Sequence, residues 1–212
     1  MNDKIMLGLL VVAGFIGTTV AAPALAQALE TFLIIEKAEV SANGELEATL
    51  TTEGAIPTDG DEGAFGYGIL TNDGDTILVA TTHAGVLDSE EQNYILDPTW
   101  HTHLVRLGEV AECGEDQGVI DITWQSPGGV EINNDNIASI SGVPTTDEFQ
   151  RWHSITGEDL SMTLGEDVSN VVSFRLDPVF DEQAGLQAVC VTDITAAEDI
   201  DVNSIAQPPQ QQ

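Results

Sequence analysis

Short apolar segments separated by Gly, Pro, Asn and Asp run along most of this chain, and they constrain its fold more than any other feature. Residues 45–50 show the pattern well, since two glutamates and a threonine alternate there with three apolar side chains. This period of two predicts a β-strand with one buried and one solvated face. Asn43-Gly44, just before it, is typical of a type I′ hairpin turn because both residues tolerate a positive φ. Residues 27–212 contain no segment with the period of an amphipathic helix.

Repetition of this pattern predicts an all-β protein, an antiparallel β-sandwich of the Ig-like or jelly-roll-like type with about nine or ten short strands and one disulfide. The expected strands are residues 32–40, 45–50, 65–70, 76–82, 98–107, 118–125, 130–132, 137–143, 168–176 and 186–194. Those at 118–125, 130–132 and 137–143 are expected to form a three-stranded meander. A single domain would then cover residues 27–195, followed by an acidic and then Pro/Gln-rich flexible tail, residues 196–212.

Residues 1–26 are predicted to be a signal peptide. Lys4 gives a short positive start, no charge follows between Ile5 and Leu29, and overlapping small-x-small sites end the hydrophobic run. Cleavage after Ala26 is favoured. The alternative is an uncleaved anchor, because an uncharged run of this length could span a bilayer. Both interpretations place the rest of the chain outside the cytoplasm, either secreted or at the cell surface.

The two cysteines of the chain, Cys113 and Cys190, agree with an extracytoplasmic location. They lie too far apart in sequence for a CxxC metal or redox pair. In an oxidising compartment a disulfide is the default. Closing so long a loop stabilises a fold by about 4–5 kcal/mol in the chain-entropy model. The alternative is a pair of buried free thiols, which behave as small apolar side chains.

The charge of the chain is strongly one-sided, with 36 acidic against 5 basic side chains and a formal net charge of −31. A hydrophobic content of 42 % is nevertheless enough for a folded core, so the charge does not indicate disorder. Its sign excludes nucleic acid and anionic lipid surfaces as partners. Cations and basic protein surfaces are the partners that it favours. No membrane insertion is expected once the signal peptide has been removed.

Two histidines, His101 and His103, are the best chemical candidates in the sequence. Residues two apart on a strand point to the same face, with their Cα atoms about 6.5 Å apart, so both imidazoles can reach one ion. A third ligand is expected from His83, at the end of the preceding hairpin, or from a nearby carboxylate; His153 is a more distant candidate. Such a set suits Zn²⁺ or copper. The alternative is a structural role, because Val105 and Leu107 continue the same face.

Other sites have less support. Asp-Gly-Asp occurs at residues 59–61 and 73–75, but neither copy has the spacing or the distal glutamate of a calcium loop, and turn chemistry accounts for both. The chain has no Gly-x-Ser-x-Gly nucleophile motif. The first functional hypothesis is therefore a secreted, acidic binding or structural module at the cell surface or in the extracellular space, and a non-enzyme is favoured over an enzyme. The second is a metal-binding protein or metal-dependent enzyme built around His101 and His103.

Overall fold

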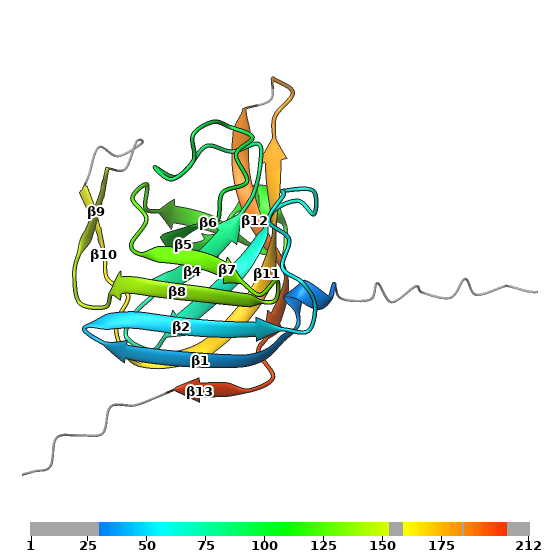
Figure 1. Ribbon diagram of the computed structural model, residues 1–212. Helices are drawn as coiled ribbons and strands as arrows, with labels where there is room; N and C mark the ends of the chain where they lie inside the picture. Colours follow the sequence, from blue (N-terminus) through cyan, green and yellow to red (C-terminus); the bar gives the residue numbers. More distant parts are fainter. Residues whose placement is uncertain (1–29, 153–158, 184, 203–212) are drawn as a thin grey trace, which may run out of the picture.

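The computed structural model describes residues 30–152, 159–183 and 185–202 (Figure 1). The expected signal peptide, residues 1–26, and His153 lie outside the described residues. The described part contains thirteen strands and two short 3-10 turns, η1 (Thr31–Leu33) and η2 (Ala111–Cys113). The all-β class predicted from the period-two pattern is therefore confirmed.

Six strands close into a barrel. In barrel order they are β11 (Val168–Phe180), β12 (Leu186–Ala196), β6 (Gln117–Ile122), β5 (His101–Glu109), β4 (Ile77–Thr82) and β3 (Phe65–Thr71). Each strand is antiparallel to both neighbours, and β3 pairs with β11 to close the ring. The seam between β6 and β12 is short, because only Cys190–Gly118 and Val191–Gln117 are in register there.

A five-stranded sheet lies against the barrel. Its order is β13 (Ile200–Val202), β1 (Ile35–Asn43), β2 (Glu45–Thr52), β8 (Ile137–Pro144) and β7 (Gly129–Asn133), with β13 parallel to β1. A separate hairpin is formed by β9 (Phe149–Trp152) and β10 (Asp159–Met162). The main core fills the space between sheet and barrel: Leu46 and Leu50 of β2 and Ile140 of β8 belong to the same buried cluster as Tyr67 of β3 and Leu104 of β5.

The expected β-sandwich is met only in part. Two layers do pack face to face, but one of them is a closed barrel instead of an open sheet. Bends in β11 help to close it, since its pairing with β12 shifts register between Ser173 and Arg175 and again between Val179 and Phe180. Such bulges increase strand twist and curvature, which a period-two pattern does not record.

The structure corrects the expected strand list in three places. The strands β9, β10 and β13 are additional, and each has only three or four residues, too few for a periodic signal. Residues 200–202, expected in the flexible tail, pair with β1 instead. The expected meander is wrong in part: β7 and β8 form a hairpin, but β6 belongs to the barrel. The chain crosses between the layers at Gly128, where a Cβ would lie 2.5 Å from Val143.

The predicted disulfide is confirmed. Cys113 in η2 is bonded to Cys190 in β12, with their Cα atoms 5.4 Å apart. It lies beside the short β6–β12 seam, since Cys190 is one of the residues in register there. Disulfides persist mainly outside the cytoplasm, so this bond supports an extracytoplasmic location. Among the described residues, no helix has the length and hydropathy needed to cross a membrane.

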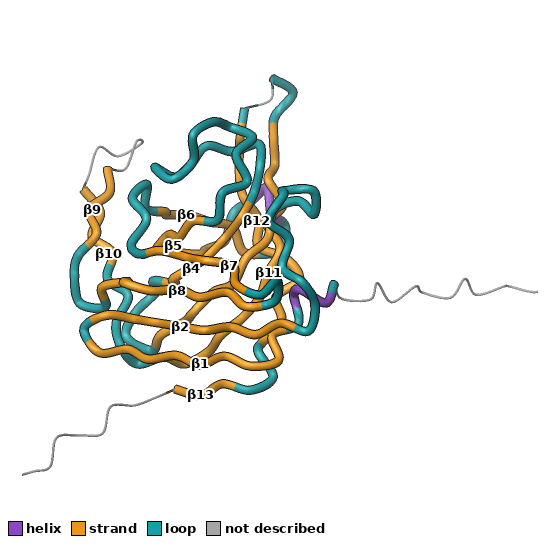
Figure 2. Tube along the Cα trace, in the orientation of Figure 1, coloured by secondary structure: helices purple, strands orange, loops and turns teal. Residues whose placement is uncertain are grey.

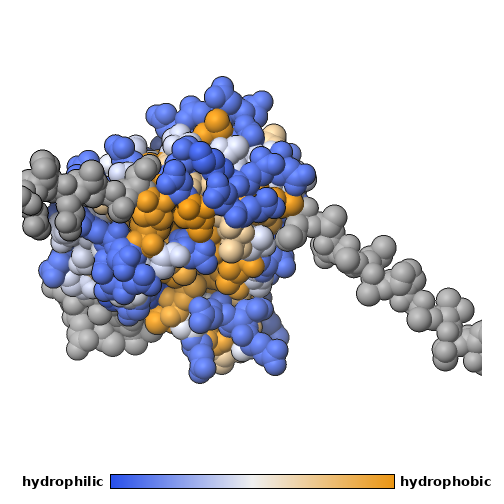
Figure 3. Space-filling model, turned by 90° about the horizontal axis from the view of Figure 1, so that it is seen from below, coloured by the Kyte–Doolittle hydropathy of each residue, from blue (hydrophilic) through white to orange (hydrophobic). Residues whose placement is uncertain are grey.

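The surface and loops reflect the composition. Hydrophilic residues cover much of the face in Figure 3, while hydrophobic residues gather near its centre. The connection between β4 and β5, residues 83–100, contains no helix or strand and is drawn as loop in Figure 2. This long connection carries several exposed apolar side chains, among them Leu87, Tyr94, Ile95 and Leu96. Its two ends are the places where the candidate histidines occur.

Candidate metal centre

Three histidines meet at one end of the barrel. His83 directly follows β4, and His101 and His103 open β5. Because β4 and β5 are antiparallel neighbours, the end of one lies beside the start of the other: Thr81 pairs with His101 and Val79 with His103. Residues 101, 103, 105 and 107 share the inward face of the barrel, since Leu104 packs on the outer face in the main core. All three histidines are buried, with exposed fractions of 4 % or less.

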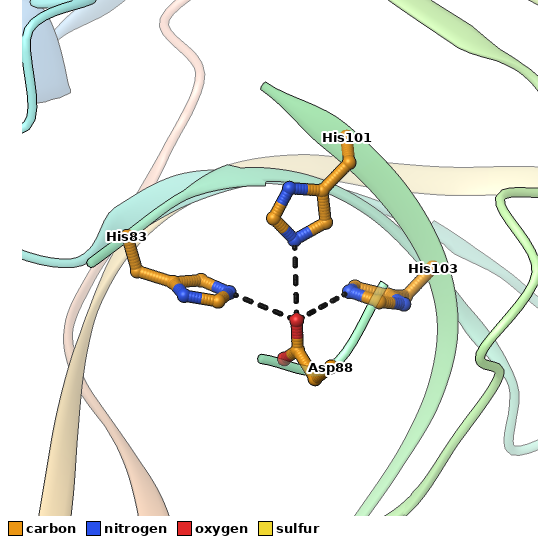
Figure 4. A group of neighbouring side chains, drawn as sticks. All are labelled: His83, Asp88, His101 and His103. Atoms are coloured by element: carbon orange, nitrogen blue, oxygen red, sulfur yellow. Dashed lines mark ion pairs between the residues drawn. The ribbon is translucent and has the colours of Figure 1, made fainter. Parts of the chain in front are cut away.

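A carboxylate completes the group. Asp88, from the long β4–β5 connection, places Oδ1 at 3.3 Å from Nε2 of His83, 3.5 Å from Nε2 of His101 and 3.6 Å from Nε2 of His103. Figure 4 shows the three imidazoles pointing toward this oxygen from different sides. One ligand atom from each residue lies within 4.8 Å of all the others. The four side chains therefore form a His/Asp cluster that could hold a metal ion.

These separations suit a small tetrahedral ion. Zinc–nitrogen and zinc–oxygen bonds of about 2.0–2.1 Å place neighbouring ligand atoms of a tetrahedron about 3.4 Å apart. The three separations between Asp88 and the histidines, from 3.3 to 3.6 Å, agree with this value. The nitrogens lie up to 4.8 Å apart, so an ion at the centre would also draw the imidazoles together.

Two of the histidines are oriented by backbone carbonyls. Nδ1 of His101 lies 2.7 Å from the Thr99 carbonyl oxygen, and Nδ1 of His103 lies 2.7 Å from that of Thr123. A carbonyl only accepts, so each Nδ1 carries a proton, and Nε2 of each ring faces the cluster. Nδ1 of His83 is buried and has no hydrogen-bond partner among the described residues.

Asp88 is held in its ionised form. Burial alone would raise the pKa of this carboxyl, but His101, His103 and His83 together outweigh burial and hold the pKa far below its usual range. The side chain is 24 % exposed, whereas those of the three histidines are exposed by 5 % or less. Asp88 is therefore the solvent-side member of the cluster and supplies its negative charge.

A hydrogen-bond network shapes the connection that carries Asp88. The backbone N–H of Asp88 donates to Oε1 of Gln92, and Nε2 of Gln92 donates to the carbonyl oxygens of Val86 and Asp97. The Asp97 carboxylate in turn accepts from the backbone and side chain of both Asn93 and Thr99. Since the Thr99 carbonyl orients His101, one buried network fixes both Asp88 and a histidine.

Asp97→Asn is expected to lower the thermal unfolding midpoint at pH 7, because an amide cannot accept all four of these hydrogen bonds. Thr99 and Asn93 hold the pKa of Asp97 well below its usual range. A lowered folded-state pKa gives stability that is complete above the unfolded value of about 3.9 and is lost as the pH falls below it. The difference between wild type and variant should therefore narrow below about pH 4. Unfolding scans at pH 7 and pH 3 measure it. Asp116→Asn, at an exposed position, serves as the control. Equal unfolding midpoints of wild type and Asp97→Asn at pH 7 would contradict a stabilising role of the Asp97 hydrogen bonds.

The structure brings together three of the histidines named as candidates from the sequence, His83, His101 and His103. Asp88 was not predicted by number; the only signal was a polar stretch beginning there, in a region where any of several carboxylates was a candidate ligand. Of the two Asp-Gly-Asp segments, residues 59–61 contain a local turn contact, in which Asp59 accepts from the backbone N–H of Asp61. Residues 73–75 form the bend between β3 and β4, and Asp73 accepts from the backbone N–H groups of Glu166 and Asp167.

No protein-family model, curated protein or solved structure matches this chain. The chemistry of the His/Asp cluster is accordingly derived from its own geometry.

Proposed function

We propose that this protein is an exported metal-binding protein that holds one Zn²⁺ or Cu²⁺ ion through His83, His101, His103 and Asp88. The observation that carries this proposal is the convergence of three Nε2 atoms on one carboxylate oxygen at a buried position. Nε2 of His101, Nε2 of His103 and Oδ1 of Asp88 are buried and have no hydrogen-bond partner among the described residues, and one shared cation would satisfy all three atoms.

The donor set selects the class of metal. Imidazole nitrogen suits zinc and copper, whereas calcium and magnesium take mainly oxygen ligands. Three neutral imidazoles and one carboxylate carry a single negative charge, so a divalent ion leaves the cluster with one positive charge. The acidic surface of the chain also favours the approach of cations. The tetrahedral separations around Asp88 favour zinc, because Cu²⁺ prefers square-planar or tetragonal sites, and direct loading with each ion tests this preference.

Four protein ligands favour stable binding over catalysis, because closed four-coordinate sites are typical of non-catalytic zinc. One observation favours a metal-dependent enzyme as the second candidate: Asp88 is the solvent-side ligand and comes from a loop. If Asp88 leaves the ion, three histidines and an open position remain, the arrangement in which a metal activates water. Asp88 would then act as a gate on that position.

Export is the second part of the proposal. It is supported by the hydrophobic, uncharged segment after Lys4, by the small residues up to Ala26 and by the Cys113–Cys190 disulfide. The mature protein would begin at Gln27 and act outside the cytoplasm, either secreted or at the cell surface. The uncleaved anchor is the alternative.

Analysis of the exported protein tests both parts on one sample. We expect an intact mass that begins at Gln27, and one equivalent of zinc or copper per chain after loading and removal of free metal. Elemental analysis gives the metal content, and mass spectrometry gives the N-terminus. Absence of both metals after loading would refute the metal centre and leave the metal-free binding module. An intact mass that begins at Met1 would refute cleavage of a signal peptide and support the uncleaved anchor.

A further inference from the structure

The barrel contains an apolar cavity that the metal centre does not use. Its volume is about 160 Å³, and it is lined by side chains from all six barrel strands. Every lining residue is apolar or glycine except Gln117. Four of the apolar residues, Val79, Val105, Phe174 and Val191, form a buried cluster separate from the main core. The interior of the barrel is thus apolar but incompletely filled.

The cavity and the metal centre share the inside of the same barrel. Val79 pairs with His103, and Val105 follows His103 by two residues on the same face of β5. From there the lining continues to Ile77 of β4, which pairs with Val105, and to Leu107 of β5. Both residues lie toward the end of their strand that is opposite the histidines. One end of the barrel axis is therefore occupied by metal ligands and the rest by apolar space.

Two glycines on β3 explain why space remains. Gly66 and Gly68 occupy the inward positions, since Phe65, Tyr67 and Ile69 face the main core. A Cβ on Gly66 would lie 2.4 Å from the Ala80 carbonyl oxygen, so the backbone there requires glycine. At Gly68 a Cβ would meet only side chains, the nearest being Val172 at 3.2 Å. No backbone contact therefore requires glycine at position 68, and the absence of a side chain there leaves space in the cavity.

We propose that this cavity binds a small uncharged apolar molecule of about the size of benzene. A buried water needs two to four polar partners, and an apolar cavity of about 150 Å³ stays dry and accepts benzene or xenon. Gln117 is the one polar side chain on the lining, which is too few for ordered water. The net charge of −31 disfavours anionic ligands such as fatty acids. This proposal does not depend on whether the histidines hold a metal.

Titration of the disulfide-bonded protein with benzene, followed by methyl chemical shifts, tests the proposal. We expect saturable shifts at valines and leucines of the lining with a Kd of about 1 mM or below, which is about −0.7 kcal/mol per ligand atom and within the known limit. Gly68→Leu fills the cavity from β3, and Val119→Phe fills it from β6. Each should weaken benzene binding by about tenfold or more while leaving metal content unchanged.

Gly129→Leu is the matched control, because a Cβ on this glycine of β7 would meet nothing within 4 Å. It makes the same chemical change on a strand outside the barrel and should bind benzene like wild type. Two filling variants from different strands keep the test valid if one of them fails to fold. Non-saturable shifts in wild type, or equal affinity in wild type and in a folded filling variant, would refute the cavity as a binding site.

Discussion

Replacing His101 and His103 together by alanine is expected to abolish metal binding. The double variant keeps only His83 and Asp88, so it loses two of the three nitrogen ligands at a buried site. Loss of a single outer-shell partner commonly costs 10–100-fold in metal affinity. We therefore expect the Kd for zinc or copper to rise by at least about 100-fold. Competition against a chromophoric chelator measures it for each metal.

His83→Ala gives the same test with less disturbance of the fold. Nδ1 of His83 has no hydrogen-bond partner among the described residues, whereas removing His103 also leaves the Thr123 carbonyl without a donor. Asp116→Asn is the control for a substitution that leaves every ligand in place, since this residue is exposed and outside the cluster. Unchanged affinity in folded His83→Ala and double-histidine variants would show that the cluster is structural.

Replacing both cysteines by alanine is expected to lower the free energy of unfolding by about 4.5 kcal/mol, the chain-entropy value for a loop of this length. The bonded residues are 77 positions apart in sequence. This loss is between about a third and nine-tenths of the total free energy of unfolding of a typical domain, about 5–15 kcal/mol. Urea denaturation of oxidised wild type and of Cys113→Ala/Cys190→Ala measures the difference.

The same experiment has an internal check. Reduction of the wild-type protein should give the midpoint of the double alanine variant, because both remove the same constraint on the unfolded chain. A loss below about 1 kcal/mol would mean that the unfolded chain retains enough structure to make the link redundant. Metal content should be the same in both proteins, since His83 follows β4 and the other two histidines lie on β5, whereas the bonded cysteines lie in η2 and β12.

The strands were largely predictable because apolar and polar residues alternate along a strand that has one buried and one solvated face. Residues 45–50, for example, show alternation and form part of β2. Barrel closure was not predictable, because it depends on bulges in β11 and on which strand neighbours β12. The three-residue β13 was missed because a parallel partner 162 positions away leaves no local signal, as in the pairing of Val40 with Val202.

The histidines of the site could be predicted, but its carboxylate could not. Spacing of two on a strand fixes the common face of His101 and His103, and antiparallel pairing of adjacent strands brings the end of one, at His83, to the start of the next. Asp88 lies in a loop whose path is set by Gln92 and Asp97, and such contacts have no period. Among 36 acidic residues, the sequence alone offers no reason to select that one.

Because the seam between β6 and β12 is short, closure of the barrel there depends on whether the surroundings are oxidising or reducing. Only two residue pairs hold these strands in register, and the Cys113–Cys190 bond joins the chain across the same place. Gln117, Val119 and Val191 on the two sides of the seam also line the apolar cavity. In a reducing cytoplasm the ring would lack its covalent closure, and the oxidising conditions met after export would supply it. The compartment in which the protein matures thus decides when the wall of the apolar cavity is covalently linked at this seam.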